Sequence, residues 1–454
     1  MMPTHVVKCV RNFISADEDA CCQATGIFIL SKRGVPTMMI IRIKKIKDFT
    51  IYGLLFMAAL NFQAKFFYFV FASLLLLYIL QRKLIVAPES LFYLFLGVFM
   101  AVSNFFEGAL SMIRCLAWVS FYWVGYNLVV ARITRYQTRI DYDPVVAEKS
   151  GFSILAIVSF GSFTHYVMNF IYNFSDSGSR NTNDIWTGKA MAATGQAALA
   201  CVMCGFAVAL IFAPRKKSQR ILGVALIIAI MAYNLILACR SLLMIILILL
   251  IIGVLYLVKV KKTAYIRFKL FIVLSLIILI LATLFTMNIF NIQDILLDSN
   301  LFERFNSGEV DSVSDTGRWY AKINFIKNGY RYPWGGLHLR EQYGYAHDLW
   351  LDGYDEYGLL GFLFLAVITL LGIMELIKLV RKTQYSREFK LTVCCVYVAI
   401  LIEFCVEPIL EGMPWLFACF CLVNGCVTGM NIAYQKNNGV RHENIADKYR
   451  LRQG

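Results

Sequence analysis

Long apolar segments recur along the chain and alternate with short polar connections. A helix that spans a membrane needs about 20 mostly apolar residues. Twelve segments are candidates: 49–63, 66–81, 90–106, 112–131, 152–173, 190–213, 221–239, 242–258, 270–290, 359–378, 391–408 and 414–431. We therefore expect an all-α polytopic integral membrane protein with about 12 transmembrane helices. The first two segments are short and interrupted by polar residues, so 49–81 is predicted to be a tight hairpin or one long broken helix.

Basic residues are concentrated in alternate connections. If all twelve segments span, about two thirds of the 44 Lys and Arg residues fall on one side of the membrane. Short basic loops remain in the cytoplasm. Removing the first span would place the RIKKIK sequence of residues 42–47 on the lysine-poor side. The charge pattern thus favours twelve spans with both termini in the cytoplasm.

The predicted spans divide the chain into five parts. Residues 1–37 have no long apolar core and no small-residue cleavage site, so we interpret them as a disordered extension or an upstream-assigned start, and not as a signal peptide. Residues 38–290 hold spans one to nine, and 291–358 form a large outer loop. Residues 359–431 hold spans ten to twelve, and 432–454 form a cytoplasmic tail.

The composition excludes several classes of protein. The chain is 59% hydrophobic and 16% charged, whereas soluble globular proteins have about 45–50% and about 25%. A soluble enzyme, a nucleic-acid binder and a disordered scaffold are therefore poor interpretations. Cytoplasmic anchoring accounts for most of the net charge of +15. Most of the 13 cysteines lie in apolar segments, where cysteine behaves as a small hydrophobic residue. We expect no disulfide framework, metal site or nucleic-acid partner.

The outer loop 291–358 is much longer than the other connections. Loops beyond about 15 residues are usually functional or disordered, and the many aromatic residues here argue against disorder. A helix is predicted within it, with four apolar side chains on one face: Trp319, Ile323, Ile326 and Tyr330. We interpret the loop as a folded lid whose helix packs on the bundle or lies at the membrane interface.

A polar string stands at the mouth of the tenth predicted span. It reads His347-Asp348-Leu349-Trp350-Leu351 and continues with Glu356, Gly358 and Gly361. Three shorter sequences accompany it: Arg240-Ser241, Gly317-Arg318-Trp319 and Pro333-Trp334-Gly335-Gly336. With twelve spans and one large loop before the tenth, this set closely resembles the O-antigen ligase and O-antigen polymerase superfamily over most of residues 40–430.

The resemblance implies a membrane glycosyltransferase at the outer face of the bacterial plasma membrane. Its donor would be an undecaprenyl-diphosphate-linked oligosaccharide, used without a cofactor, nucleotide sugar or metal. A polymerase passes the glycan to the next lipid-linked repeat of a capsule, O-antigen or exopolysaccharide. A ligase passes it to a lipid A core or a protein. The implied partners are this donor, a glycan or lipid-linked acceptor, membrane lipids, and a chain-length regulator and flippase.

The chemistry of such a transfer assigns the first site residues. A base must take the proton of the acceptor hydroxyl, and cations must stabilise the departing diphosphate. His347 suits the first task, and Arg240 and Arg318 suit the second because a guanidinium pairs with phosphate oxygens. His347 could instead bind the diphosphate as a cation or pack between helices. Arg240 could snorkel to lipid headgroups, and Arg318 could be a surface charge.

Other residues are candidates for binding the substrate. They are Arg180, Arg304, Trp334, Asp348, Glu403 and Glu407. Acidic side chains in a span are rarely inert, so the two glutamates could pair with the arginines or contact an acceptor sugar. Asp348 stands where the family more often has Asn, which leaves its role open. His165, in the fifth predicted span, is more often a core histidine with a satisfied partner.

The remaining motif residues are interpreted as structural. They are Leu351, Glu356, Gly358 and Gly361. If 347–361 is one helix, His347 and Leu351 share a face and Glu356 points the opposite way. Glu356 would then anchor this helix to a neighbour, and the two glycines would let another helix approach closely.

Two other classes of function stay open. Twelve spans also suit a transporter or lipid flippase, because a fold alone does not fix a function. Such a protein should show repeat symmetry and broken midplane helices, which the sequence lacks. A non-enzymatic assembly scaffold is a third possibility.

Overall fold

The computed structural model describes most of the chain after residue 48. The described residues are 49–82, 84–136, 144–174, 182–260 and 318–450, together with Leu297, Ser299 and Phe302. The chain divides into two units, Met1–Gly53 and Leu54–Gly454. All packing described below lies within the second unit.

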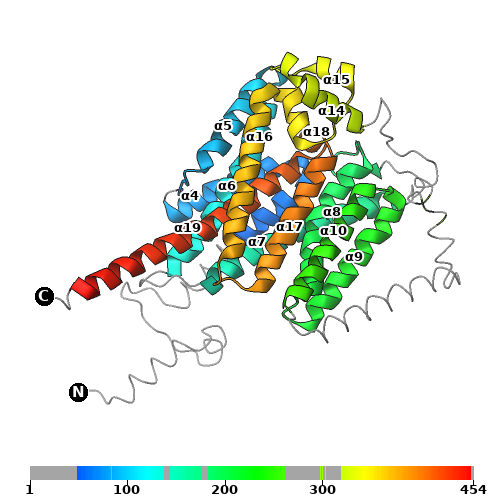
Figure 1. The fold of residues 1–454 in the computed structure, drawn as a ribbon. Coiled ribbons are helices and arrows are strands. Elements are labelled where there is room, and N and C mark those ends of the chain that lie inside the picture. Colours follow the sequence, from blue (N-terminus) through cyan, green and yellow to red (C-terminus); the bar gives the residue numbers. More distant parts are fainter. Residues whose placement is uncertain are drawn as a thin grey trace, which may run out of the picture. The chain divides into compact units, whose positions relative to one another are not determined.

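Helices form almost all of the described structure (Figure 1). Eight are long and apolar enough to cross a membrane: α6 (Ala109–Tyr136), α7 (Pro144–Tyr172), α8 (Ala193–Phe212), α9 (Lys217–Leu237), α10 (Arg240–Val260), α16 (Leu349–Arg381), α17 (Arg387–Val406) and α19 (Pro414–Arg450). The predicted class, an all-α membrane protein, is thereby confirmed. Twelve spans and the placement of the termini stay predictions.

The other four predicted spans differ from the eight. Three are shorter apolar helices: Phe49–Ala59, α4 (Phe66–Gln81) and α5 (Ser90–Ser103). A short 3-10 turn, η1 (Phe62–Ala64), precedes α4, and Asn61, Gln63 and Ala64 there have positive φ angles. This turn separates two helices, so 49–81 is not one continuous helix. The ninth predicted span, 270–290, lies outside the described residues.

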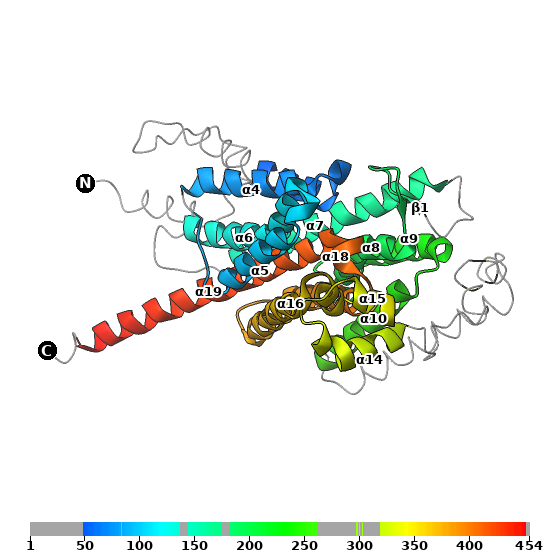
Figure 2. The ribbon, with the colours of Figure 1, turned by 90° about the horizontal axis from the view of Figure 1, so that it is seen from above.

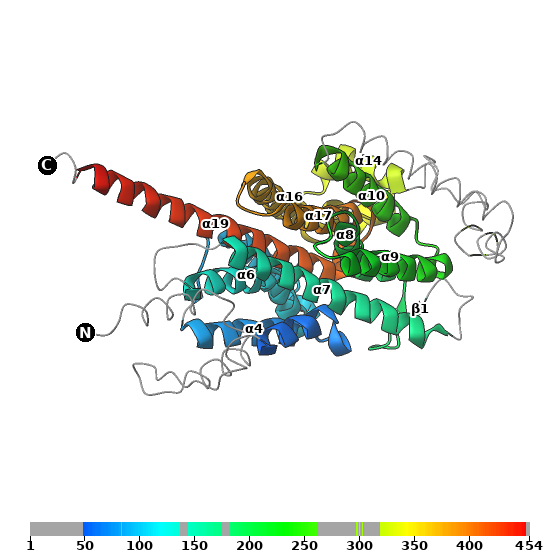
Figure 3. The ribbon, with the colours of Figure 1, turned by 90° about the horizontal axis from the view of Figure 1, so that it is seen from below.

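Small residues allow the central helices to pack closely. Helix α19 runs along α6 (Figure 3), and α8 is surrounded by α7, α9, α10 and α17. A Cβ atom on Gly425 of α19 would collide with the Tyr122 carbonyl of α6, and one on Gly205 of α8 would lie 2.6 Å from Val396 Cα of α17. Lipid supplies no hydrophobic force between spans, so such close backbone contact drives their association.

A polar bridge joins three helices inside this packing. Asn424 of α19 accepts a hydrogen bond from Tyr397 Oη of α17 at 2.8 Å and donates one to Tyr93 Oη of α5 at 2.9 Å. All three side chains are buried. Because each polar group finds a partner, the bridge adds specificity without leaving an unsatisfied group in an apolar interior.

The described part of the predicted outer loop, 291–358, folds into a small layer of short helices. It contains α14 (Arg318–Asn328), η5 (Gly329–Arg331) and α15 (Leu337–Tyr343), and we call residues 318–346 the cap. Four buried residues form its core: Phe325, Leu339, Ala346 and Tyr354. The cap lies against α16 and the short helix α18 (Ile409–Gly412), which connects α17 to α19 (Figure 2). Residues 318–346 are thus folded, whereas a large outer loop over 291–358 that acts as a lid stays a prediction.

The apolar face predicted for α14 does not pack on the bundle. Trp319, Ile326 and Tyr330 are 58%, 74% and 73% exposed, respectively, whereas Ala321 and Phe325 are buried. Sequence periodicity identified the helix and its apolar stripe correctly. It did not reveal that Ala321 and Phe325, on the other side, contact the core of the cap.

A break within α16 separates the motif helix from the tenth span. Gly358 has φ 70° and ψ −169°, a conformation that glycine adopts readily and other residues rarely do. The cap turn at Pro333–Gly336 enters this break. Leu359 N donates to Pro333 O at 2.8 Å, and Gly336 N donates to Asp355 O at 2.7 Å. The turn is thus attached to α16 on both sides of the break.

The condition that 347–361 forms one helix, on which the predicted helix face depends, is not met. Helix α16 begins at Leu349, so His347 lies outside it and does not share its face with Leu351. The close approach at Gly358 is made by the Pro333–Gly336 turn, and at Gly361 by Tyr357 of the same helix, so no second helix fills either place.

We expect Gly358→Ala to destabilise the folded protein. Its positive φ is unfavourable for alanine by about 1–3 kcal/mol, and the new Cβ would lie 2.6 Å from Pro333 O. The midpoint of thermal unfolding in detergent should fall clearly. Gly412→Ala is the matched control, because its Cβ would meet only Pro408 Cγ at 3.8 Å. Equal midpoints for the two variants would contradict the assigned role of Gly358.

Candidate functional site

Two basic side chains of the cap bind the end of α17. Arg318 Nη1 donates to Val406 O at 3.0 Å, and Lys322 Nζ donates to Cys405 O at 2.6 Å. The last carbonyl groups of a helix have no intrahelical donor and carry its negative dipole end. Because Arg318 and Lys322 are four residues apart in α14, they share a helix face and can reach neighbouring carbonyls.

The same two cations also face carboxylates. Arg318 Nη1 lies 3.8 Å from Glu407 Oε1, and Lys322 Nζ lies 3.3 Å from Asp348 Oδ2. The carboxylates are almost buried, while the Arg318 and Lys322 side chains stay 31% and 19% exposed. The cations can therefore still be reached from outside. The predicted residues Arg318, Glu407 and Asp348 thus come together at one end of α17.

A second cluster of charged residues lies close to Tyr345, the aromatic neighbour of His347. Arg340 Nε of α15 donates to Asp355 Oδ2 at 2.9 Å, and its Nη1 lies 3.4 Å from Glu411 Oε2. The guanidinium carbon is 4.2 Å from the centre of the Tyr345 ring, whose hydroxyl donates to Glu411 at 2.8 Å. The His347 ring lies 4.4 Å from the Tyr345 ring, centre to centre. His347 is therefore packed against an aromatic ring that also contacts the Arg340 guanidinium.

Asp348 caps the N-terminus of the motif helix. Its Oδ1 accepts a hydrogen bond from Leu351 N at 2.8 Å, which satisfies one of the free amides at the helix start. The preceding residue, His347, has a φ of 53°. Burial raises the pKa of the Asp348 carboxyl above its ordinary value, although the Leu351 amide and Lys322 oppose this. Asparagine is an equally good cap, so either residue suits this position.

A buried glutamate lies beneath the cations. Glu403 of α17 is fully buried, and neither carboxylate oxygen has a hydrogen-bond partner among the described residues. Glu407 and the Ser241 hydroxyl are close to it. Ser241 follows Arg240, the first residue of α10. The turn before α10 therefore approaches the same end of α17. Arg240 itself is the first residue of α10.

Other predicted residues are placed elsewhere or fall outside the described part. Leu351 borders the core of the cap. Trp334 is 88% exposed and belongs to the turn that enters the Gly358 break. Glu356 lies on α16, and its side chain is hydrogen-bonded to that of Tyr357 on the same helix. Its role as an anchor to a neighbouring helix stays a prediction. Arg180 and Arg304 lie outside the described residues.

Four residues that sequence reasoning missed belong to this site: Lys322, Arg340, Tyr345 and Asp352. Asp352 is 2% exposed, and neither of its carboxylate oxygens has a hydrogen-bond partner among the described residues. On the same helix, Asp348 faces Lys322 and Asp355 faces Arg340. The spacing of these three aspartates, four and then three residues apart, was a usable signal because it places them on one helix face.

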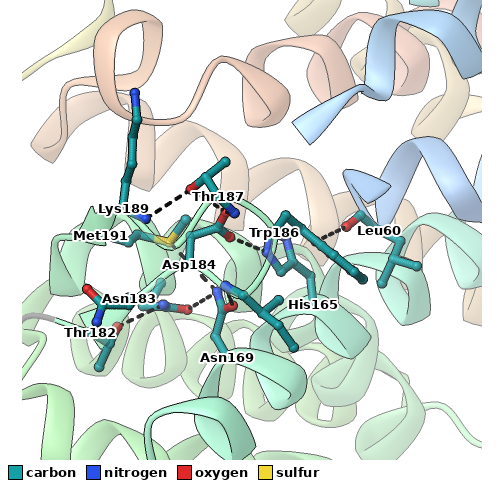
Figure 4. A network of polar contacts seen from close by, with 12 residues as sticks. Leu60, His165, Asn169, Thr182, Asn183, Asp184, Trp186, Thr187, Lys189 and Met191 are labelled. Atoms are coloured by element: carbon teal, nitrogen blue, oxygen red, sulfur yellow. Dashed lines mark hydrogen bonds and ion pairs between the residues drawn. The ribbon is translucent and has the colours of Figure 1, made fainter. Parts of the chain in front are cut away.

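A second polar network lies between α7 and α8 (Figure 4). His165 Nε2 is 2.7 Å from Asp184 Oδ1, and Thr187 donates to Asp184 Oδ2 from its amide at 3.0 Å and its hydroxyl at 2.8 Å. Burial alone would raise the pKa of Asp184, but the bonds from His165 and Thr187 outweigh it and lower that pKa. His165 is buried with a partner, as predicted for a core histidine.

This network orders the connection before α8. The short strands β1 (Thr182–Asn183) and β2 (Ala190–Met191) pair antiparallel, with Thr182 opposite Met191. Asn173 donates to Asn183 O at 2.8 Å and accepts from Asn183 N at 2.7 Å. Asn169 also accepts from Ile185 N at 2.9 Å. The hairpin is thereby tied to the last turns of α7.

Comparisons with known proteins do not assign the chain to a family. No model of a known protein family matches the chain, and a search of the curated proteins finds no match. The function of the site is therefore argued from its chemistry and from the motifs.

We expect two substitutions of Asp348 to differ in stability, because this residue is the N-cap of helix α16. Asp348→Ala removes the acceptor of Leu351 N and should lower stability by about 0.5–2 kcal/mol, whereas Asp348→Asn keeps that acceptor. Thermal unfolding of the purified variants measures the difference. An equal loss of stability in both variants would show that the charge of the carboxylate stabilises the protein, and not its hydrogen bond to Leu351 N.

Because the pKa of Asp348 is raised, the stability of the folded protein should depend on pH. The folded state holds this proton more tightly than the unfolded state, so wild-type stability falls as pH rises from the ordinary carboxyl pKa to the raised one. Asp348→Asn should lack that component of the fall. Unfolding midpoints measured across the acid range test this, and identical slopes for the two proteins would contradict it.

We expect His165→Phe to destabilise the hairpin strongly. Removing one partner of a buried hydrogen bond costs about 1–3 kcal/mol, because Asp184 would lose its contact with the His165 ring. Thr187→Val is the control, since it removes the hydroxyl bond and leaves the Thr187 amide bond. Hydrogen exchange of residues 182–191 reports the opening. Equal protection in the two variants would contradict a dominant role for His165.

Proposed function

We propose that the chain is a membrane glycosyltransferase that polymerises undecaprenyl-diphosphate-linked oligosaccharide repeats at the outer face of the bacterial plasma membrane. One observation carries the proposal. Three partly exposed cations gather near the start of an apolar helix of spanning length. Lys322 contacts Asp348 of the motif, and Arg318 contacts Glu407. Arg340 stacks on the Tyr345 ring, which also packs against the His347 ring. A lipid-linked diphosphate needs cations at that depth, where its chain is in the bilayer and its phosphates are at the surface.

The proposed reaction forms one glycosidic bond and breaks one phosphoester bond. The acceptor hydroxyl oxygen attacks the anomeric carbon of the donor sugar, and the bond from that carbon to the diphosphate oxygen breaks. Undecaprenyl diphosphate leaves with the bonding electrons, and Arg318 and Lys322 stabilise its negative charge. The acceptor proton passes to His347 as general base.

The carboxylates near the cations fit a holding role. Glu407 and Asp348 face Arg318 and Lys322, and the carbonyls of α17 fix the same two side chains. Cations held in place before the diphosphate arrives need little reorganisation during the reaction, which is the property that makes electrostatic catalysis effective. Arg240, at the start of α10, is a further candidate for the diphosphate.

The acceptor distinguishes polymerase from ligase. The same donor chemistry would serve transfer to a lipid A core or a protein, so ligase-type transfer is the alternative form of this proposal. A transporter or flippase would move the lipid-linked glycan without breaking the phosphoester bond. Turnover of a defined donor therefore separates all three.

The test uses the purified full chain in nanodiscs with a defined undecaprenyl-diphosphate oligosaccharide, with and without a second lipid-linked acceptor. Wild type should release undecaprenyl diphosphate and lengthen the glycan. His347→Ala should lower the rate by about 10²–10⁴-fold, the usual contribution of a general base, and Arg318→Ala should also lower it. Arg220→Ala is the control, because Arg220 is an exposed arginine at the start of α9.

The outcomes are distinct. Lengthening with the lipid-linked acceptor supports a polymerase, and transfer only to an added lipid A core supports a ligase. Intact donor after incubation with well-folded wild type would reject a glycosyltransferase of this class. Unchanged rates in the His347 and Arg318 variants would reject the assigned site.

A further inference from the structure

The cap carries an exposed aromatic and basic surface that the proposed reaction does not use. We call it the outer stripe, and it consists of Trp319, Ile326, Lys327, Tyr330, Arg331 and Trp334. Its apolar members are 58–88% exposed. Soluble surfaces rarely gather large apolar side chains in this way, and such patches mark contact with a partner or a membrane.

The packing of α14 leaves this stripe facing outward. Ala321 and Phe325 are buried on the side of the cap core. Arg318 and Lys322 bind the end of α17. Trp319 and Ile326, seven residues apart, lie on the side of α14 opposite Ala321 and Phe325. Tyr330, in η5 directly after this helix, is also exposed. A helix that is apolar on two opposite sides has more apolar surface than the cap core can cover.

The bonds to α17 set the depth of α14. Arg318 and Lys322 attach it to the last two residues of a helix that is apolar and long enough to span. The end of a span lies at the boundary between hydrocarbon and water. Tryptophan and tyrosine are enriched at that boundary because their rings have an apolar body and a polar edge.

The charge of the outer stripe identifies the partner. Lys327 and Arg331 are exposed beside the aromatic rings, and no acidic residue belongs to the stripe. Arg331 Nε lies 3.2 Å from Tyr330 Oη, and its guanidinium carbon is 5.7 Å from the centre of that ring. Basic residues beside apolar aromatic ones on one helix face are typical of an interfacial helix that binds anionic lipid.

We propose that the outer stripe docks on the bilayer surface, with its aromatic rings among the lipid headgroups and with Lys327 and Arg331 against anionic lipid phosphates. Docking holds α14 at headgroup depth. Because the same helix carries Arg318 and Lys322, the bilayer then fixes the height of the charged site above the hydrocarbon. This inference does not depend on the transfer reaction, since it concerns the position of the cap alone.

The first test measures the surroundings of residue 326 with a spin label on Ile326→Cys. The full chain is placed in nanodiscs of phosphatidylcholine and phosphatidylglycerol, and the unsubstituted chain is labelled in parallel to give the background. Collision with oxygen, which concentrates in lipid, is compared with collision with a water-soluble nickel complex. Leu363→Cys is the lipid reference, because Leu363 is 47% exposed within α16. Lys189→Cys, exposed on the β1–β2 hairpin, is the water reference.

The label at 326 should resemble the lipid reference, with oxygen collisions exceeding nickel collisions. Nickel collisions as frequent as at residue 189 would overturn the proposal, and the stripe would then be open to a glycan or a protein. Protection from both reagents would also overturn it, because a protein surface would then cover the stripe. Ile326 is 74% exposed, so its replacement should not prevent folding.

A second arm tests the lipid charge. The label at 326 is measured again after Lys327→Gln and Arg331→Gln are combined, and separately in nanodiscs of phosphatidylcholine alone. Both changes should increase nickel collisions several-fold, because the attraction to anionic phosphates is lost. Unchanged collisions in both arms would overturn the assignment to anionic lipid.

Discussion

A helix that ends within a folded assembly leaves its last carbonyl groups without intrahelical donors. At the end of α17 those groups are Cys405 O and Val406 O, and the cap supplies the donors from Lys322 and Arg318. This interaction fixes α14 on the bundle. It also places two cations beside Glu407 and Asp348. The charged site exists because Arg318 and Lys322, which bind the last carbonyl groups of α17, also face nearby acidic residues.

The second constraint is the break at Gly358. The Pro333–Gly336 turn bonds to Asp355 and Leu359 across this break, so the cap is attached to α16 as well as to α17. The motif helix between Asp348 and Tyr357 is consequently held at both ends. The Asp348 side chain binds its first amide groups, and the Pro333–Gly336 turn binds its other end. His347, immediately before that helix, lies beside Tyr345 and near Arg340. The motif helix is thus fixed at both ends next to His347.

The proposed chemistry and the proposed docking depend on different faces of α14. Arg318 and Lys322 face α17, whereas Trp319, Ile326 and Tyr330 face outward. A diphosphate attached to a lipid enters from the bilayer surface. A cap seated on that surface would meet it without a large movement. Asp352 and Glu403 are buried near these cations without hydrogen bonds from described residues, and such carboxylates are costly unless a donor or proton reaches them.

Sequence alone determined the all-α class and the eight helices that are long and apolar enough to cross a membrane, because about 20 apolar residues suffice to identify such a helix. It also identified the motif and the outer helix. It could not find Lys322 and Tyr345, because their partners are distant in the chain: Lys322 and Cys405 are 83 residues apart, and Tyr345 and Glu411 are 66 apart. The break at Gly358 and the role of Asp348 as a cap were likewise decided by tertiary structure. Periodicity reports which residues share a face of one helix, whereas only packing decides what each face meets.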